Sequence, residues 1–422
     1  MTAVEGSNTA DRPGNGVPEF VHESSQRYAN DPFTVQVDGA EARLPESAID
    51  LRQRARAFVD ANVSPIASEI DQKNRTPEEL RAAMAREGFF GLSIPEEYGG
   101  RGSVLETCLA VEEFSRVSAS VGLLVAVQLL GSTPLVLGGT EKQKQDWLPH
   151  FAAGERFCSY CLTEPGAGTD AASVQTRVEQ GADGYTINGF KHYITGAGRS
   201  DLYTVFARSG EGRTEMTAML VPAGPAGLAA AATHPFTGIR GVPVGQLKFD
   251  EVRLPDENVL GEPGKGFRLA LATLDRARPA IAAQALGLAQ GALDAAISYL
   301  GNRVQFGHPL LEQPVVQYRL SRHAASIAAA RQLTYHAAML ADARRPELNA
   351  AASMAKLFAT DTAMEVVTDA MQFWGGAGYF IGSPVERMFR DAKIMQIYEG
   401  TNEIQSLVIV RSMMRQLEGR QG

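Results

Sequence analysis

The segment Met395-Gln-Ile-Tyr-Glu-Gly-Thr-Asn-Glu403 contains a carboxylate, Glu399, that is placed to do acid–base chemistry. Glu399 lies between a tyrosine and a glycine, with apolar residues just upstream. A carboxylate held against apolar groups costs free energy, and burial raises its pKa toward neutrality, which suits a general base. Glu399 is therefore a candidate catalytic base. The alternative is an ordinary glutamate that caps or pairs at a helix end.

A second stretch, Tyr160-Cys-Leu-Thr-Glu-Pro-Gly-Ala-Gly-Thr-Asp170, ends a strand-like run and enters a glycine-rich turn. Its glycines allow backbone N–H groups to approach an aromatic or anionic ligand, and Thr163 and Thr169 offer hydroxyls. For a Gly-Ala-Gly taken alone, a strand followed by an ordinary Pro-Gly turn would be the favoured interpretation. Neither Gly166-Ala-Gly168 nor Gly196-Ala-Gly198 completes GxGxxG within a βαβ unit, so a Rossmann site is disfavoured. Glu164 and Asp170 are expected to hold the turn by accepting backbone N–H groups.

Composition excludes several classes of function. The 422 residues are 44% hydrophobic and 21% charged, which is ordinary for a globular protein of two or three domains. The formal net charge of −8 argues against nucleic acid as a partner. No apolar run of the ~18 residues that span a bilayer and no secretory or organellar leader is recognised, so we expect neither a membrane partner nor export.

The chain has three cysteines, which are too few for a disulfide framework. Cys158 and Cys161 have CxxC spacing, but they lie in a strand-like run rather than at a helix N-terminus, so we expect no metal or redox site there. Unpaired cysteines favour a reducing, cytoplasmic setting.

The periodicity of the chain divides it into four parts. Residues 1–44, rich in Gly, Pro, Ser and Asn, are expected to be a mobile extension. Residues 45–156 have helical spacing of apolar residues, whereas residues 157–262 contain five or six short β-forming runs separated by Gly-containing turns. Residues 263–422 are again helical, with four long helices expected near 267–301, 311–342, 349–374 and 384–415. The expected fold is mostly α with a central β domain: an N-terminal helical domain, a small antiparallel barrel or sandwich, and a C-terminal four-helix bundle.

The order of these parts and four landmark segments resemble the acyl-CoA dehydrogenase family, over about residues 45–415. The family's two signatures are matched by Cys161-Leu-Thr-Glu-Pro-Gly-Ala-Gly-Thr-Asp170 and by Gln372-Phe-Trp-Gly-Gly-Ala-Gly-Tyr379, which continues to Arg390-Asp-Ala-Lys393. Lys191-His-Tyr-Ile-Thr195 and Tyr398-Glu-Gly-Thr401 are the other two landmarks.

The resemblance implies an FAD site between the β domain and the C-terminal bundle, and it implies no metal. On one side of the flavin it places Tyr160, Leu162, Thr163 and Thr169. On the other side it places Tyr193, Ile194 and Thr195, with Tyr193 where the family usually has tryptophan. The ADP half of FAD is implied to reach a neighbouring subunit, at Arg303, Phe306, Gln372, Gly375 and Gly376. Thr401, Asn402 and Glu403 complete the implied cofactor contacts. Many relatives have glutamine where this chain has Pro314, and Gln313 is the candidate substitute.

For catalysis, the resemblance implies that Glu399 takes the α-proton of an acyl thioester while FAD accepts a hydride from the β-carbon. The backbone N–H of the glutamate and a flavin ribityl hydroxyl polarise the thioester carbonyl in the family. Substrate contacts are implied for Thr169, Asp275, Arg278 and Gly400. Isovaleryl- and long-chain-type relatives carry the base on an earlier helix, where this chain has Ala277, so Glu399 is expected to be the only base.

The expected function is thus α,β-dehydrogenation of an acyl-CoA to the trans-2-enoyl thioester, with electrons passed to an electron-transfer flavoprotein. A homotetramer, or at least a dimer, is implied by the shared flavin site. Three alternatives remain open: the same chemistry on an acyl-carrier-protein thioester, an oxidase that uses oxygen, and a non-catalytic or DNA-binding relative. The acidic charge and Glu399 weigh against the last of these.

Overall fold

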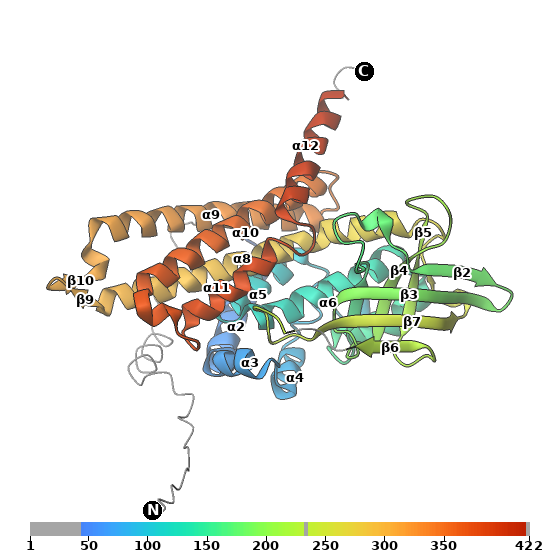
Figure 1. Cartoon of the computed structure of the whole chain (residues 1–422), viewed down its shortest axis with the longest axis horizontal. Coiled ribbons are helices and arrows are strands. Elements are labelled where there is room, and N and C mark those ends of the chain that lie inside the picture. The colour runs from blue at the N-terminus through green and yellow to red at the C-terminus, as the bar shows by residue number, and fades with distance from the viewer. Residues whose placement is uncertain (1–43, 232–234, 419–422) are drawn as a thin grey trace, which may run out of the picture.

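The computed structural model describes residues 44–231 and 235–418. The extension expected over residues 1–44 lies outside the described residues, except for Leu44. In Figure 1 the described chain runs from helices, through a sheet domain, to a second set of long helices. The expected fold class, mostly α with a central β domain, is confirmed.

Two of the N-terminal helices, α5 and α6, are buried over most of their length, because they pack against each other and against the long C-terminal helix α8 (Gly266–Asn302). Helix α6 has no charged residue and is buried over most of its length, as its all-round apolar sequence predicts. Helix α7 begins at a capping box, in which Thr140 and Gln143 bond each other's backbone N–H groups. The helices are α2 (Glu46–Phe58), α3 (Ala67–Lys73), α4 (Glu78–Arg86), α5 (Val104–Val117), α6 (Ala119–Gly138) and α7 (Glu141–Ala152).

The central domain is a single sheet with the strand order β6-β7-β3-β2-β4-β5-β8 among the described residues, and β1 pairs with β4. The sequence had led us to expect a wholly antiparallel domain. The sheet is instead mixed, because β1 and β2 both run parallel to β4. The strands are β1 (Cys158–Cys161), β2 (Arg177–Gly181), β3 (Gly184–Thr195), β4 (Leu202–Arg208), β5 (Met216–Pro222), β6 (Leu228–Ala231), β7 (Val244–Leu254) and β8 (Val259–Leu260).

The C-terminal helices α8 (Gly266–Asn302), α9 (Pro314–Asp342) and α10 (Leu348–Trp374) run side by side (Figure 1). A hairpin of β9 (Val304–Gln305) and β10 (His308–Pro309) joins α8 to α9. The fourth long helix expected over 384–415 is wrong as one element. It is two helices, α11 (Pro384–Met395) and α12 (Asn402–Glu418), and the turn between them carries Glu399.

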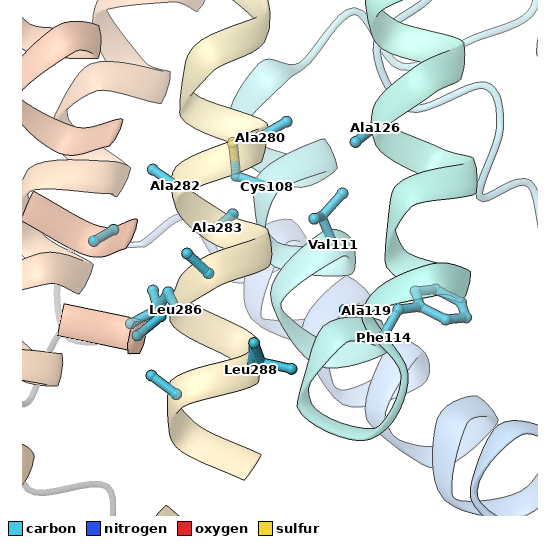
Figure 2. Close-up of a cluster of buried hydrophobic side chains, with 14 of the residues drawn as sticks. Cys108, Val111, Phe114, Ala119, Ala126, Ala280, Ala282, Ala283, Leu286 and Leu288 are labelled. Atoms are coloured by element: carbon cyan, nitrogen blue, oxygen red, sulfur yellow. The ribbon is translucent and has the colours of Figure 1, made fainter. Parts of the chain in front are cut away.

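Close packing joins the N-terminal helices to the bundle. Small residues line the face of α8 that meets α5, where Ala280 and Ala283 lie close to Cys108 and Val111 (Figure 2). A Cβ atom at Gly287 would come within 2.1 Å of the backbone oxygen of Glu112, so only glycine allows this approach. The alanine-rich composition of α8 therefore brings two backbones together, and it fixes α8 as the platform for the site described below.

Two helices of the described chain, α6 and α8, are long and apolar enough to cross a membrane by length and composition alone. We did not expect any such run from the sequence. Both are mostly buried against the rest of the protein, which is how a core helix of a globular protein also behaves.

Candidate active site

Glu399 lies in a turn with an unusual backbone. Its φ angle is +54°, in the left-handed region that side chains other than glycine rarely adopt, and Gly400 follows at φ +94°. Strain of this kind persists only where surrounding contacts enforce it, and it gathers at functional sites. The turn separates α11 from α12, so the backbone N–H and carbonyl of Glu399 take no part in the hydrogen bonding of either helix.

Three side chains hold the carbonyl groups of this turn. The Glu399 carbonyl accepts hydrogen bonds from Arg278 Nε and Gln405 Nε2, both at 3.3 Å. The Gly400 carbonyl accepts from Lys356 Nζ at 2.9 Å and again from Gln405, at 2.8 Å. Because Arg278, Lys356 and Gln405 come from α8, α10 and α12, three helices fix the position of the base.

The Glu399 carboxyl group is electrostatically unusual. Its Oε2 atom is buried and has no hydrogen-bond partner within the described part of the chain. Burial raises the pKa of Glu399 to about 7, against the opposing effect of the positive charges of Arg278 and Lys356. The N–H of Glu399 also lacks an acceptor among the described residues. A base that is half ionised at neutral pH, beside a free backbone donor, is suited to removing a weakly acidic proton.

Tyr398 anchors the turn from the other side. Its hydroxyl donates to Gln284 Oε1 on α8, and Gln284 Nε2 donates in turn to the carbonyl of Ala119 at the start of α6, at 2.8 Å. This chain of contacts ties the Glu399 turn to the N-terminal domain.

The glycine-rich turn after β1 is held as expected. Glu164 accepts hydrogen bonds from the backbone N–H groups of Gln175 (2.5 Å) and Thr176 (3.0 Å). It also forms a buried ion pair with Lys191, 2.7 Å away, which donates to the carbonyl of Leu162 as well. Asp170 makes more exposed contacts, with Ser173 and Arg213.

Lys191 thus links the end of β1 to β3, and this contact brings the two predicted flavin segments together. A Cβ atom added at Gly166 or Gly168 would meet nothing within 4 Å, so the turn presents bare backbone in open space. Such a cradle fits a large planar or anionic ligand.

The four residues predicted on one side of the flavin differ in how far they are buried. Tyr160 is half-buried, with its hydroxyl donating to the Ala270 carbonyl on α8 at 3.1 Å. Burial of this hydroxyl, and then the charge of Glu399, raise the pKa of Tyr160. Leu162 is buried in the core, so it can offer a ligand only its backbone. Thr163 is half-buried and Thr169 is exposed.

On the other side, the regular alternation of β3 fails at His192 and Tyr193. The register of β3 against β7 shifts between Lys191 and Ile194, and Tyr193 adopts φ +55°. As a result the Tyr193 ring is 67% exposed and packs edge-on against His192, although alternation predicts opposite directions for the two side chains. Ile194 is buried in the sheet core, and Thr195 is half-buried with its carbonyl bonded by Ser159 Oγ.

The residues expected to contact substrate near the base are engaged with one another. Arg278 forms an ion pair with Asp275 at 2.6 Å, and Asn349 Nδ2 donates to the same carboxylate. Arg278 is buried, and its contact with the Glu399 carbonyl shows that it supports the turn. Ala277, at the rival base position, is also buried and cannot take a proton.

The residues predicted to contact the ADP half of FAD lie at the opposite end of the bundle. Arg303 follows the last residue of α8, Phe306 in the β9–β10 hairpin is 93% exposed, and Gln313 directly precedes α9. The exposed Gln372, Gly375 and Gly376 lie where α10 ends, and stacking of Trp374 on Tyr299 places that end beside α8. Arg278 on α8 and Arg303 at its C-terminal cap are 25 residues apart, or about 37 Å at helical rise. A single chain therefore does not bring the two groups together.

Beyond Glu399, a cavity of about 350 Å³ is lined by residues of α10, α11, α12 and the turn between α11 and α12. Thr401 and Glu403 line it, together with Lys393 and Ile397. Asn402 also borders it, but its side-chain amide already bonds Thr360, Asp361 and Lys356, which leaves little capacity for a ligand.

The two CxxC cysteines are buried free thiols. Burial raises the pKa of Cys158 to about 12 and that of Cys161 well above its ordinary value, so neither is a reactive thiolate.

Sequence reasoning missed Lys356 as a member of the site. The available signal was a single lysine in the alanine-rich stripe Ala351-Ala-Ser-Met-Ala-Lys-Leu-Phe-Ala359, where a charge on the buried face of a helix needs an explanation.

The fold and this site define a chain with a helical domain, a sheet domain and a helical bundle, in which a buried glutamate faces a glycine-rich turn. Three family models match this order: the N-terminal domain of acyl-CoA dehydrogenase at residues 45–155, its middle domain at 159–252 and its C-terminal domain at 264–414. The protein belongs to the acyl-CoA dehydrogenase family, whose members are flavoproteins.

Individual relatives agree. The chain is 45% identical to the "Probable acyl-CoA dehydrogenase fadE25" of Mycobacterium leprae, over 88% of this chain and 97% of that one. It is 40% identical to the human mitochondrial short-chain specific acyl-CoA dehydrogenase, over 88% and 91%. Among solved structures, butyryl-CoA dehydrogenase from Megasphaera elsdenii matches with a TM-score of 0.86 at 39% identity, covering 88% of this chain and 99% of that one. A chain solved in work on the electron transferring flavoprotein of Acidaminococcus fermentans has the same TM-score at 40% identity, covering 88% and 99%.

Proposed function

We propose that this acyl-CoA dehydrogenase binds FAD and removes the α-proton of a short-chain acyl-CoA with Glu399, forming the trans-2-enoyl thioester. The observation that carries the proposal is the buried Oε2 of Glu399, which has no partner among the described residues and belongs to a carboxyl with a pKa of about 7. The short acyl chain is favoured by the short-chain specific and butyryl-CoA relatives.

The residues present fit a flavin. Backbone at Gly166 and Gly168 is open, and the Tyr193 ring is exposed at the facing segment. Tyr160, Leu162, Thr163 and Thr169 would hold one side, and Tyr193, Ile194 and Thr195 the other. Bound FAD supplies the acceptor for the hydride that leaves the β-carbon of the substrate.

The chain's own residues do the remaining work. Glu399 accepts the α-proton at its carboxyl group, and the free N–H of Glu399 is available to polarise the thioester carbonyl, which makes that proton more acidic. Arg278, Lys356 and Gln405 keep the base in place through the carbonyl bonds described above. Protein around Oε2 excludes water and so keeps the base in the partly protonated range.

The second half of the FAD contacts is proposed to come from a neighbouring subunit, through Arg303, Phe306, Gln313, Gln372, Gly375 and Gly376. Supporting this, those residues lie at the far end of the bundle from Glu399, and Phe306 is almost fully exposed. A homotetramer, or at least a dimer, follows from the proposal. Electron-transfer flavoprotein is the proposed acceptor, and the cytoplasm the proposed location.

The test is anaerobic bleaching of the flavin by a panel of acyl-CoA and acyl-carrier-protein thioesters. We expect bleaching by short acyl-CoA substrates, and we expect Glu399→Gln to slow it by at least about 10³-fold while FAD stays bound. Near-normal bleaching in that variant would refute the base assignment. A preference for carrier-protein thioesters would mean that the substrate is an acyl-carrier-protein thioester rather than an acyl-CoA. Hydrogen peroxide formed without an added acceptor would indicate an oxidase.

A further inference from the structure

Lys356 is a buried lysine that forms no direct ion pair with any described residue. Its side chain is fully inaccessible, and no carboxylate of the described residues lies within ion-pair distance of its ammonium group. Its two hydrogen bonds are to neutral acceptors, the Gly400 carbonyl at 2.9 Å and Asn402 Oδ1 at 2.8 Å. Lys191, the other fully buried lysine, is instead paired directly with Glu164. Because an unpaired buried charge is costly, the position of Lys356 needs a functional explanation.

Both partners of Lys356 belong to the turn that carries the base. Gly400 follows Glu399 directly, and Asn402 begins α12. Asn402 also bonds Thr360 and Asp361 on α10, so the ammonium group closes a connected set of contacts between α10 and the turn. These contacts hold the left-handed backbone at Glu399 and Gly400. They are needed because a glutamate does not favour this conformation by itself.

We propose that Lys356 is the positioning residue of the Glu399 turn, holding its backbone through Gly400 and Asn402 and favouring the charged form of the base through its own positive charge. The proposal rests on the function proposed for Glu399.

Electrostatics agree with this geometry. Burial lowers the pKa of Lys356 to about 7, and the Glu399 charge opposes that shift more than any other group does. Burial raises the pKa of Glu399, and the positive charges of Arg278 and Lys356 in turn lower it. The two groups titrate as a pair, and their attraction favours the state in which the lysine carries the proton and Glu399 is ionised. The other titratable and charged groups around this pair are Asp275 and Arg278 on α8, Asp361 on α10, Glu403 on α12, Tyr160 on β1 and Tyr398 in the turn.

The experiment compares three variants of the holoenzyme across pH 5.5–9.5. Lys356→Gln keeps a hydrogen-bond donor and removes the charge, Lys356→Arg keeps the charge, and Ser353→Ala is the control. Ser353 lies one turn earlier on α10, is equally buried, and bonds only the Asn349 carbonyl. FAD content and Tm are measured for each, together with the rate of anaerobic flavin reduction.

We expect Lys356→Gln to move the acidic limb of the rate profile up by about one pH unit or more, which lowers the rate at pH 7 by roughly fivefold and the rate at pH 9 much less. Lys356→Arg should return the limb toward the wild-type position, and Ser353→Ala should leave it unmoved. A limb that stays in place in Lys356→Gln, with FAD bound, overturns the electrostatic part of the proposal. An equal loss at every pH in both lysine variants would reduce Lys356 to a structural residue.

A second readout needs no catalysis. The gain in Tm caused by Glu399→Gln should continue to grow to higher pH, and level off at a larger value, in the Lys356→Gln background than in the wild-type background, because the folded-state pKa of Glu399 has risen while its unfolded-state pKa has not changed. If no thioester bleaches the wild-type flavin, the proposed function fails, whereas this measurement still decides whether Lys356 sets the ionisation of Glu399. A gain that levels off at the same pH and the same value in both backgrounds overturns the proposal.

Discussion

At the scale of single residues, the site depends on one carboxyl group whose environment opposes its charge. Glu399 has an ordinary pKa of 4.5, which burial raises to about 7 in the folded protein. The folded state therefore binds the proton more tightly than the unfolded chain does. It follows that the favourable contribution of Glu399 to stability is complete below pH 4.5 and is lost as the pH rises through about 7.

This sign makes a prediction for stability. Glu399→Gln should match the wild type near pH 4.5 and become more stable than it above pH 7, by up to roughly 3 kcal/mol for a shift of this size. The measurement is Tm of both proteins at pH 5 and pH 8.5. Glu403→Gln is the control, because the pKa of that exposed acid is lowered and its replacement should bring no gain at high pH. Equal Tm differences at both pH values would show that Glu399 is not destabilised by ionisation.

The sequence predicted Glu399 as the base, but not the side chains that hold its turn in place. Glu399 could be found because a short segment around it contains the acid, the glycine and the flanking tyrosine. Lys356 is 43 positions earlier and contacts the turn only because α10 folds back beside it. Arg278 was predicted to bind substrate, while its bonds to the Glu399 carbonyl and to Asp275 show a supporting role that spacing alone does not reveal.

At the scale of elements, the break between α11 and α12 is the feature that sequence periodicity missed. No proline interrupts residues 385–415, and the apolar spacing continues through the turn, so one helix was expected. The break is imposed from outside, by hydrogen bonds from α8 and α10 to carbonyl groups that a continuous helix would use internally. Tertiary contacts override local preference here, and they do so at the functional residue.

Gly400→Ala tests how much this break matters. At φ +94° a side chain is strained, and the added Cβ would lie 2.6 Å from Gln405 Nε2, which holds the turn. We expect a loss of about 1–2 kcal/mol in stability and at least a tenfold fall in the rate of flavin reduction. Gly301→Ala is the control, since Gly301 is within α8 and a Cβ there meets only Leu311 Cδ2 at 3.8 Å. A Gly400→Ala enzyme with normal rate and Tm would show that the left-handed turn is dispensable.

At the scale of the whole molecule, the order of domains could be predicted because the hydrophobic period changes from helical to alternating and back. The order of strands could not, because β1 pairs with β4 and β3 with β7, far along the chain. The predicted cofactor residues fall into two groups at opposite ends of the bundle, a separation that follows from the 37 residues of α8.

Helix α12 projects from the bundle in Figure 1 and carries an exposed apolar stripe, which is consistent with contact between subunits. The stripe consists of residues that are all about half exposed or more: Leu407, Val410, Met414 and Leu417.

If each flavin site combines Glu399 of one subunit with Arg303 of another, two inactive variants should repair each other. Glu399→Gln leaves Arg303 intact, and Arg303→Glu leaves Glu399 intact, so one of the two sites in a mixed pair contains both native residues. Random pairing then restores roughly one quarter of the wild-type flavin reduction in the unfractionated pool and roughly one half in the isolated mixed pair, whereas each variant alone shows little. Two affinity tags isolate the mixed oligomer after co-expression. Mixing Glu399→Gln with Gly400→Ala is the control, because both changes affect the same turn and no site in the mixed pair is intact. Absence of recovery in a tag-purified mixed oligomer that retains FAD would place Arg303 outside the shared site.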